Sequence, residues 1–581
     1  MKRCLWNIRG KRGPHRLSFT ALFFLSSVTQ PTSSFLIGVR PASQTDVAIK
    51  RSSLRRSTAS LPLACRCKNI FTGRSSSASC CANTASATAS DSIVETVLGP
   101  RDAAARQKAR LRQLVNANEK DNPKTDRFGI KKFHHVEFYC GDATAATSHF
   151  ANGLGMNLVA KSDLATGNTK HASYVIQSND LRFVCTAPYL PTAAAGGDGE
   201  GKGDDAGATA STPFPGFDQD KAQKFFRRHG MAVRAIGIEI EDARGAYEQC
   251  TSHGGVGIQP PTFVEDSDGR GGVTISEIRA YGDVVLRFIS FGSGRADEQG
   301  EKEKGHGATA EVRVVDQEEK KSFSGAFLPN FQDMEISGKA AARGDFGLQR
   351  PDHIVGNVWD LLESVDYITR MTGMHEFAEF SASDVGTIDS GLNSIVVANN
   401  NEMVLLPVNE PTFGTKKTSQ IQTYLEQNDG PGVQHMAFKT NDIFRTIQLM
   451  RATVGGFEFV EAPGPSYYRG MQERIPSLTD EQVMQIEELG ILADEDDEGV
   501  LLQIFTKPVG DRPTLFFEII QRIGCVVEPN DEDSEGDWIP ESKGGTGFLQ
   551  KGGCGGFGVG NFKILFELVE KYEDSIGIGD K

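Results

Sequence analysis

The feature that most constrains the fold of this chain is an internal repeat. Residues 350–358 can be laid without gaps on residues 132–140, and residues 430–438 on residues 230–238. A second run of strand and helix patterns therefore follows the first in the same order. This duplication predicts two similar domains along the chain.

Each copy shows a strand, a helix and three strands in succession. In the first copy this succession occurs twice. Apolar and polar residues alternate in the expected strands, and apolar residues recur at helical spacing in the expected helices. These segments are Phe133–Tyr139, Ala143–Leu154, His171–Gln177 and Leu181–Thr186, then Val233–Ile240, Ala243–His253, Thr274–Arg279 and Val284–Phe291. The pattern predicts an α+β fold of repeated βαβββ modules.

Three polar residues lie in the middle of apolar strands in the second copy, namely His353, His435 and Glu518. With residues 286–289 laid on residues 515–518, the corresponding residues of the first copy are His135, Ala235 and Ile289. One copy thus keeps a set of three candidate ligands, and the other has lost two of the three.

Two histidines and one carboxylate on neighbouring strands form the facial triad of Fe(II) oxygenases, which leaves coordination positions open for substrate and O2. A buried carboxylate without a partner costs several kcal/mol, so Glu518 is expected to meet a cation. The alternative is that the histidines are ordinary core residues and that Glu518 pairs with Arg512 or Arg522.

The first 90 residues differ in composition from the rest, with 14 Lys and Arg against one acidic residue, Asp46. A basic stretch, Lys2–Arg16, precedes an apolar run, Leu17–Leu25, which is too short to span a bilayer but suits a signal peptide. The basic, hydroxylated stretch behind it suits a transit peptide. We expect a two-part leader for a complex plastid, with the mitochondrion or the cytoplasm as alternatives.

Charge and cysteine content narrow the class of protein further. A net charge of −14 argues against nucleic-acid binding, because no basic surplus is present to neutralise phosphates. The body holds five scattered cysteines, an odd number, which predicts a reduced compartment and no disulfide framework. These are Cys140, Cys185, Cys250, Cys525 and Cys554.

Long motifs in the body match those of a known family. They are Lys161–Asn168, Asp384–Thr387, Gly391–Ser394, Met403–Pro411, Ser419–Leu425, Leu501–Pro508, Asp511–Pro513 and Gly552–Gly558. From about Phe133 to its end, the chain closely resembles the 4-hydroxyphenylpyruvate dioxygenases of the plant and algal type.

The resemblance implies the vicinal-oxygen-chelate fold of glyoxalases and extradiol dioxygenases, an α+β fold with two open β-barrels of paired βαβββ modules. The second barrel would be catalytic, and the first would have lost its metal site. The expected divisions are a leader and disordered segment at 1–120, the first barrel at 125–295, a disordered linker at 296–325, and the catalytic barrel with a C-terminal lid helix at 326–581.

The resemblance also implies the chemistry. One Fe(II) per subunit, held by His353, His435 and Glu518, would serve the conversion of 4-hydroxyphenylpyruvate and O2 to homogentisate and CO2. This reaction belongs to tyrosine and phenylalanine catabolism and supplies precursors of tocopherol and plastoquinone. The partners would be these small molecules alone, in a homodimer that is neither a nucleic-acid-binding nor an integral membrane protein.

The family motifs assign pocket residues as well. A polar set would form a relay towards the substrate and the iron: Ser394, Asn409, Gln420, Gln434 and Gln503. A second set would bind the substrate, with its phenylalanines around the ring: Pro407, Phe505, Phe516, Phe557, Asn561 and Phe562. The alternatives are polar contacts at sheet edges for the amides and core packing for the phenylalanines.

The C-terminal segment has the pattern of a lid. The glycine-rich stretch Gly552–Asn561 precedes Phe562–Tyr572, in which apolar residues recur at helical spacing. A flexible hinge before an amphipathic helix suits a lid that closes over the metal, and a fixed cap on the barrel is the alternative.

Three other functions fit parts of the same pattern. A hydroxymandelate synthase would use the same substrate and iron, but Pro407, Asn409 and Phe505 favour the homogentisate product. An extradiol catechol dioxygenase would need a histidine or tyrosine acid–base near the metal, which the sequence does not offer. A non-catalytic binding protein of this fold would have no reason to keep all three ligands.

Overall fold

The computed structural model describes ten stretches of the chain. They are residues 125–190, 212–291, 322–335, 344–381, 391–413, 417–496, 499–527, 537–539, 548–550 and 552–578. The leader expected over residues 1–120 lies outside these stretches, as does most of the linker expected over residues 296–325.

The first half of the described chain forms one mixed sheet with three helices. Its elements are β1 (Ile130–Tyr139), α2 (Ala143–Leu154), β2 (Asn157–Ser162), η1 (Leu164–Thr166), β3 (His171–Ser178), β4 (Leu181–Pro188), α3 (Gln219–His229), β5 (Ala232–Ile240), α4 (Ala243–Ser252), β6 (Gly257–Glu265), β7 (Gly272–Tyr281), β8 (Val284–Ser290) and β9 (Gln332–Asp333). The strand order is β6-β7-β8-β5-β1-β4-β3-β2-β9, with the first strands of the two modules, β1 and β5, antiparallel neighbours at its centre.

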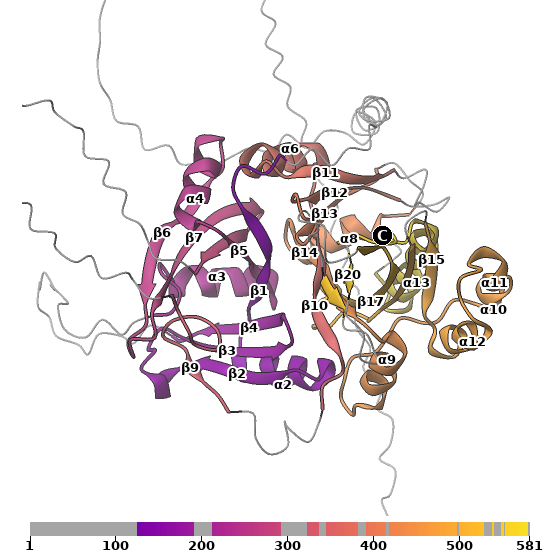
Figure 1. Ribbon diagram of the computed structural model, residues 1–581, viewed down its shortest axis with the longest axis horizontal. Coiled ribbons are helices and arrows are strands. Elements are labelled where there is room, and N and C mark those ends of the chain that lie inside the picture. The colour runs from indigo at the N-terminus through magenta and orange to yellow at the C-terminus, as the bar shows by residue number, and fades with distance from the viewer. Residues whose placement is uncertain are drawn as a thin grey trace, which may run out of the picture. The chain divides into compact units, whose positions relative to one another are not determined.

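The second half repeats this plan (Figure 1). Its elements are β10 (Leu348–Asn357), α6 (Leu361–Thr372), β11 (His375–Phe380), β12 (Leu392–Ala398), β13 (Leu405–Pro411), α8 (Gln420–Gln427), β14 (Gly432–Thr440), α9 (Ile443–Ala452), α10 (Pro465–Tyr468), α11 (Met471–Arg474), α12 (Asp480–Leu489), β15 (Leu492–Glu495), β16 (Gly499–Phe505) and β17 (Phe516–Gly524). Their sheet order is β11-β12-β13-β10-β14-β17-β16-β15. The remaining elements are β18 (Val526–Val527), β19 (Asp537–Ile539), β20 (Phe548–Gln550) and α13 (Val559–Ser575).

Both sheets thus contain paired βαβββ modules, which confirms the predicted fold. A local signal marks each module: the helix after its first strand begins at an aspartate whose side chain accepts a hydrogen bond from the first helical turn. The four capping residues are Asp142 for α2, Asp242 for α4, Asp360 for α6 and Asp442 for α9.

The strand register confirms two of the three repeat positions and corrects the third. His353 lies opposite Ala437, just as His135 lies opposite Gly237, so these equivalent pairs align the two copies in a common frame. In that frame Glu518, opposite Ala437, corresponds to Arg287, opposite Gly237, and the expectation of Ile289 is wrong. A shift of two residues keeps every side chain on its own face of a strand, so the apolar pattern alone could not exclude it.

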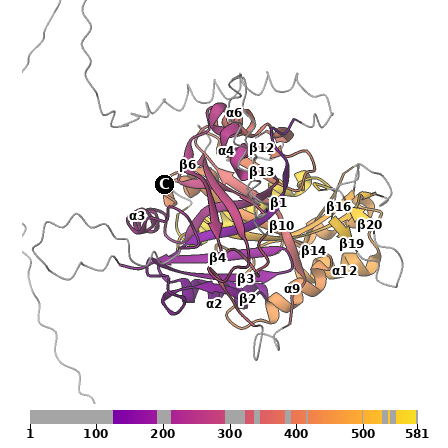
Figure 2. The same cartoon turned by 60° about the vertical axis from the view of Figure 1, so that its left-hand side comes forward.

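An aromatic core joins the two sheets. The ring of Phe183 on β4 lies 5.5 Å from Phe438 on β14 and 5.9 Å from Phe517 on β17, measured between ring centroids. Helices α4 and α6 lie side by side in both Figure 1 and Figure 2, where Arg370 donates a hydrogen bond to the carbonyl oxygen of His253. Each barrel therefore forms part of the other's support.

The expected absence of disulfides is wrong at one place. Cys525, just after β17, is bonded to Cys554 in the glycine-rich segment, while the other three body cysteines are free and buried. The two cysteines are separated by 29 residues. The odd count and scattered positions could not reveal a bond that depends on the return of the chain to the end of β17.

Replacing Cys525 by serine is expected to lower the free energy of unfolding by about 3 kcal/mol, because the bond restricts a loop of this length in the unfolded chain. Chemical denaturation measures the loss. A thiol reductant should destabilise the wild-type protein by a similar amount and leave the variant unchanged. Equal sensitivity of both proteins to the reductant would contradict the prediction.

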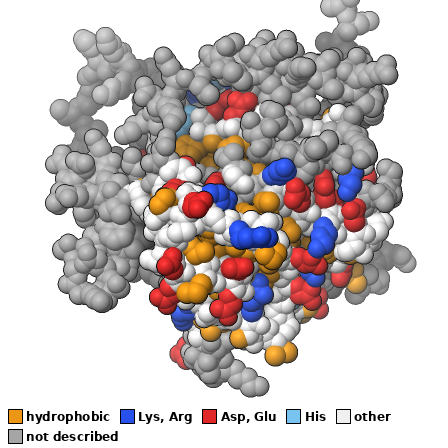
Figure 3. Space-filling view, turned by 90° about the vertical axis from the view of Figure 1, so that its right-hand side faces the viewer, with side chains coloured by type: hydrophobic (Ala, Val, Ile, Leu, Met, Phe, Trp, Pro, Cys, Tyr) orange, Lys and Arg blue, Asp and Glu red, His pale blue; other side chains and the backbone are white. Residues whose placement is uncertain are grey.

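Among the described residues, no helix combines the length and the apolar character needed to cross a membrane. Figure 3 shows the face over α10–α12, where acidic and basic side chains are interspersed rather than gathered by sign.

Candidate metal centre

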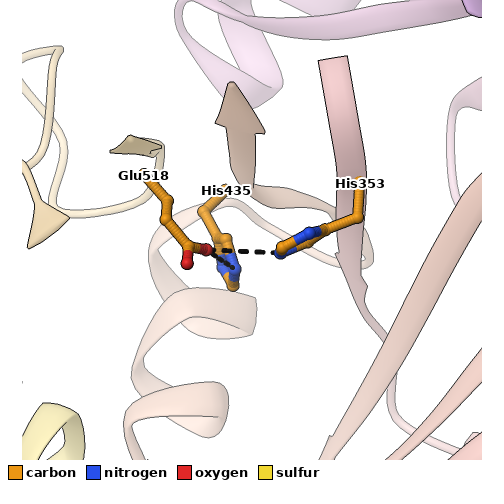
Figure 4. Close-up of side chains that lie close together, drawn as sticks. All are labelled: His353, His435 and Glu518. Carbon is orange, nitrogen blue, oxygen red and sulfur yellow. Dashed lines mark ion pairs between the residues drawn. The ribbon is translucent and has the colours of Figure 1, made fainter. Parts of the chain in front are cut away.

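Three side chains converge from β10, β14 and β17 (Figure 4). The Oε2 atom of Glu518 lies 3.2 Å from Nε2 of His353 and 3.6 Å from Nε2 of His435. The ligand atoms of all three residues lie within 4.8 Å of one another. Because β14 is central between β10 and β17, residues far apart in sequence face one point.

Each histidine is held in the tautomer that turns Nε2 to the centre. Nδ1 of His353 donates to Oδ2 of Asp352 at 2.9 Å, and Nδ1 of His435 donates to Oε1 of Gln434 at 3.0 Å. Such hydrogen bonds fix the orientation of metal-binding imidazoles and increase their basicity. The Nε2 lone pairs are thereby directed at the point where Glu518 presents its carboxylate.

The buried arginine next to this centre, Arg522, pairs with a carboxylate other than that of Glu518. Arg522 forms a two-pronged ion pair with Asp352, with Nε 2.9 Å from Oδ1 and Nη2 2.7 Å from Oδ2. Both side chains are fully buried. Neither Arg522 nor Arg512, which donates to the carbonyl oxygens of Arg228 and Gln427, neutralises Glu518.

The titration behaviour of the site suits a divalent cation. Burial and the neighbouring His353 hold the pKa of His435 well below its ordinary value, so its imidazole is neutral and able to ligate. Burial also disfavours the charged form of His353, but hydrogen bonds to Asp352 and Glu518 outweigh it and raise the pKa of His353. A metal ion would take the place of that proton. Two imidazoles and one carboxylate are a donor set for Fe(II).

Four of the predicted pocket residues line one small cavity of about 30 Å³ beside the centre: Gln420, Gln434, Phe505 and Phe516. The ring of Phe516 stacks on His435 with a centroid distance of 4.8 Å. The ring of Phe505 meets Phe516 edge to face at 6.2 Å. The structure therefore brings together two amides and two aromatic rings within reach of His435, one of the candidate metal ligands.

The predicted phenylalanines of the C-terminal segment lie on the other histidine. Phe557 packs edge to face on His353 at 5.3 Å between centroids. Phe562 packs on Phe380, the last residue of β11, with a centroid distance of 5.1 Å. Phe380 in turn contacts Phe557 at 6.2 Å between centroids. These rings form a continuous aromatic cluster that ends at His353, a candidate metal ligand.

Three further predicted residues lie on β12 and β13. Ser394 is paired with Asn409 across the two strands, and Pro407 with Val396. Asn409 donates to Oδ1 of Asn357 at 3.2 Å, and Nδ2 of Asn357 is buried without a partner in the described part of the chain. Among the described residues no hydrogen bond joins Ser394 to Asn409 or Gln420, so the relay stays a prediction.

The last two predicted residues meet the C-terminal helix. Asn561 on α13 accepts a hydrogen bond from the hydroxyl of Tyr467 at 2.7 Å. Gln503 on β16 is 3% exposed and lies under Gly558, where a Cβ atom would come within 2.5 Å of its side-chain nitrogen. Gly558 also has a φ of 73°, a conformation that favours glycine, so no other residue fits this approach without strain.

Helix α13 itself confirms the predicted helical segment, whereas lid motion remains a prediction. The helix carries a buried carboxyl, Glu573, into the wall of the small cavity beside the metal centre. Burial, with smaller effects from Glu570 and Asp574, raises the pKa of Glu573 to about 8.

This carboxyl predicts a pH-dependent stability. Since its pKa is higher in the folded than in the unfolded chain, the folded protein loses stability as the pH rises from about 4.5 to 8. Replacing Glu573 by glutamine should therefore increase the free energy of unfolding at pH 9 by up to about 4 kcal/mol and bring no gain at pH 4. Denaturant titrations at both pH values measure this, with Glu567→Gln, exposed on the same helix, as the control.

Asp352, Arg522 and Asn357 were not identified as site residues from the sequence. A signal was present for two of them: Asp352 directly precedes a candidate ligand, and Arg522 lies four residues after Glu518, on the same face of its strand. Their pairing with each other required the strand order. Asn357 carries no comparable signal.

An arginine occupies the third ligand position in the first barrel. Nη1 of Arg287 lies 3.1 Å from Nε2 of His135, the counterpart of His353. Its other nitrogens donate to Glu277 at 2.8 Å and to Glu137 at 2.7 Å. A guanidinium thus supplies the positive charge that a metal would supply in the second barrel.

Comparisons with known proteins agree with this geometry. Residues 350–504 match the model of the glyoxalase/bleomycin resistance protein/dioxygenase superfamily. The chain is 46% identical over 458 residues to the 4-hydroxyphenylpyruvate dioxygenase of Arabidopsis thaliana, an alignment covering 78% of this chain and 91% of that protein. It is 49% identical over 457 residues to the enzyme of the same name from Plectranthus scutellarioides, covering 78% and 91%.

A solved structure has a similar fold. A mutant of 4-hydroxymandelate synthase from Streptomyces coelicolor superposes with a TM-score of 0.53 at 21% identity, covering 77% of this chain and 99% of that chain. At this identity the likeness concerns the fold alone.

Proposed function

Because this chain belongs to the 4-hydroxyphenylpyruvate dioxygenase family, we propose that it binds Fe(II) through His353, His435 and Glu518 and converts 4-hydroxyphenylpyruvate and O2 to homogentisate and CO2. The observation that carries the proposal is the convergence of two oriented imidazoles and one buried carboxylate. The same reaction would place the enzyme in tyrosine and phenylalanine catabolism, upstream of tocopherol and plastoquinone.

A metal held by His353, His435 and Glu518 would supply Lewis-acid chemistry towards the α-keto acid group of the substrate and O2. The chain would contribute orientation. The rings of Phe505, Phe516 and Phe557 surround the two histidines and offer apolar surfaces to an aromatic substrate. They also limit the access of water to the centre.

The amides would position the polar ends of the substrate. Gln434 is engaged with His435 through its oxygen, which leaves its amino group free to donate. Gln420 lines the same cavity from the first turn of α8. Asn409 and Asn357 form a buried pair whose second donor, Nδ2 of Asn357, is without a partner in the described residues and could meet a substrate oxygen.

Product analysis tests the proposal. The purified protein with Fe(II), ascorbate and 4-hydroxyphenylpyruvate should consume O2 and release homogentisate, identified by chromatography. A 4-hydroxymandelate product would assign the chain to the alternative reaction. Absence of O2 consumption would support a non-catalytic binding function instead.

We also propose that the basic leader directs the protein to a plastid and that the enzyme is a homodimer. The first proposal rests on the composition of residues 1–90, and the second on the family resemblance. A fluorescent fusion of residues 1–120 and light scattering of the purified protein test them separately. Mitochondrial or cytoplasmic fluorescence, or a monomeric mass, would contradict them.

A further inference from the structure

A cavity of about 410 Å³ opens in the first barrel, and the proposed reaction does not use it. Its size lies within the range of small-molecule sites. Four aromatic side chains line it, each at most 9% exposed: Tyr139, Phe214, Phe217 and Phe225. We call this cavity the first-barrel pocket.

The first-barrel pocket occupies the place that the catalytic pocket has in the second barrel. Val285 in its wall lies opposite Ala235 on β5, as Phe516 lies opposite His435 on β14. The two positions are therefore equivalent. The smaller valine leaves space where the second barrel has a phenylalanine ring.

A second pair of wall residues shows the same equivalence. Glu277 lies opposite Arg287 across β7 and β8, as Phe505 lies opposite Glu518 across β16 and β17. Both Glu277 and Arg287 line the first-barrel pocket. The duplicated site thus survives as a cavity, although its metal ligands do not.

At the inner end of the first-barrel pocket, the polar groups of Arg287 are already engaged by other side chains. All three nitrogen atoms of the Arg287 guanidinium are engaged by protein side chains, two carboxylates and one imidazole, as described above. The guanidinium also packs over the ring of Phe214 at 4.2 Å. This end offers a bound molecule a rigid wall and no reactive group, which favours binding without turnover.

The mouth, in contrast, carries positive charge in excess. Three basic side chains of the lining have carboxylates within 4 Å: Lys221 with Asp218 at 3.8 Å, Arg228 with Asp283 at 3.1 Å, and Arg234 with Glu277 at 3.9 Å. Lys224 and Arg279 form no ion pair within 4 Å in the part of the chain that the structure describes, although Lys224 acts on the carboxylate of Asp218 from a greater distance. An anion would find two cations there that no carboxylate of the described residues contacts directly.

We propose that the first-barrel pocket is a second, non-catalytic site that binds a small aromatic carboxylate. The ring of the ligand packs among the four aromatic side chains, and its carboxylate is held at the mouth by Lys224 and Arg279. Aromatic pairs and charge-assisted hydrogen bonds supply the two parts of this recognition.

Calorimetric titration of the full chain with phenylacetate tests the site. Phenylacetate has the ring and the carboxylate but no adjacent keto oxygen, so it cannot chelate a metal as an α-keto acid does. The Kd should rise about threefold in Lys224→Gln and in Arg279→Gln, and about tenfold in the double variant, the scale of solvent-exposed ion pairs. Lys131→Gln, which removes an exposed charge from the same barrel outside the pocket, should leave the Kd unchanged.

A second variant tests the cavity rather than the charge. Val285→Phe places in the first barrel the residue found at the equivalent position of the second barrel, and should abolish phenylacetate binding by filling the space. Production of homogentisate should continue in this variant, because the first-barrel pocket is outside the metal centre.

Three results would overturn the inference. The first is no measurable binding of phenylacetate, and the second is an equal Kd in the wild-type protein and in the Lys224→Gln, Arg279→Gln double variant. The third is a Kd that rises in Glu518→Gln but not in the double variant, which would locate phenylacetate in the second barrel. Each of these results leaves the proposed dioxygenase reaction untouched.

Discussion

Replacing Glu518 by glutamine is expected to abolish metal binding and to lower turnover by about a thousandfold or more. Glutamine keeps the shape of the side chain but removes the anionic oxygen that lies 3.2 Å and 3.6 Å from the two histidines. Loss of one charged group at a reacting centre lowers turnover on this scale. With two neutral imidazoles alone, the site would no longer offer the donor set of a facial triad.

Metal content after dialysis against Fe(II), measured by elemental analysis, and homogentisate formation are the two readouts. Glu458→Gln is the matched control, since Glu458 is an exposed carboxylate paired with Lys507 in the same barrel. The control should keep both metal and turnover. Full iron content in Glu518→Gln would show that the three side chains do not form the metal site.

Much of the fold could be predicted because the same pattern of strands and helices occurs in both halves of the sequence. The alternation of strands and helices, the aspartate at the start of each module helix, and the glycine-rich entry to α13 are all local signals. His353 and His435 were aligned correctly because gapless stretches of nine residues surround them. The alignment of Glu518 with Ile289 was wrong, since a two-residue shift along an apolar strand keeps the same residues on its buried face.

The residues that hold the candidate metal ligands in place could not be predicted in the same way. Asp352 and Arg522 are 170 residues apart, and their ion pair depends on the order of β10, β14 and β17 in the sheet. The bond between Cys525 and Cys554 likewise depends on the return of the chain after β20. Periodicity describes which face of an element is buried, but not which element packs beside it.

Arg522 is expected to contribute strongly to the stability of the second barrel. It connects Asp352, and through it the ligand His353, to the glycine-rich segment, where its Nη1 donates to the carbonyl oxygens of Cys554 and Gly556. Replacing Arg522 by methionine would leave the buried carboxylate of Asp352 without its hydrogen-bonded charge partner, and with only the more distant Arg350, at 3.8 Å, to offset its charge. Removal of one partner of such a pair costs about 3 to 5 kcal/mol.

The pH dependence distinguishes this cause from a simple loss of packing. Burial disfavours ionisation of Asp352, but the charge of Arg522 outweighs it and holds the pKa of Asp352 well below its ordinary value. A lowered pKa contributes stability above the pKa of the unfolded chain, about 3.9, and this contribution disappears as the pH falls through the folded value. The difference between the wild-type protein and Arg522→Met should therefore be largest near pH 7 and shrink below pH 4.

A double-mutant cycle with Asp352→Asn isolates the pair. The Arg522→Met, Asp352→Asn double variant should be more stable than Arg522→Met alone, because the asparagine removes a buried charge that Arg350, at 3.8 Å, offsets only in part. Its metal affinity should still fall about 10- to 100-fold, since a neutral amide supports the Nδ1 proton of His353 less strongly than a carboxylate. Additive losses of stability in the cycle, with no pH dependence, would mean that Arg522 acts by packing alone and not as the counter-ion that holds the ligand in place.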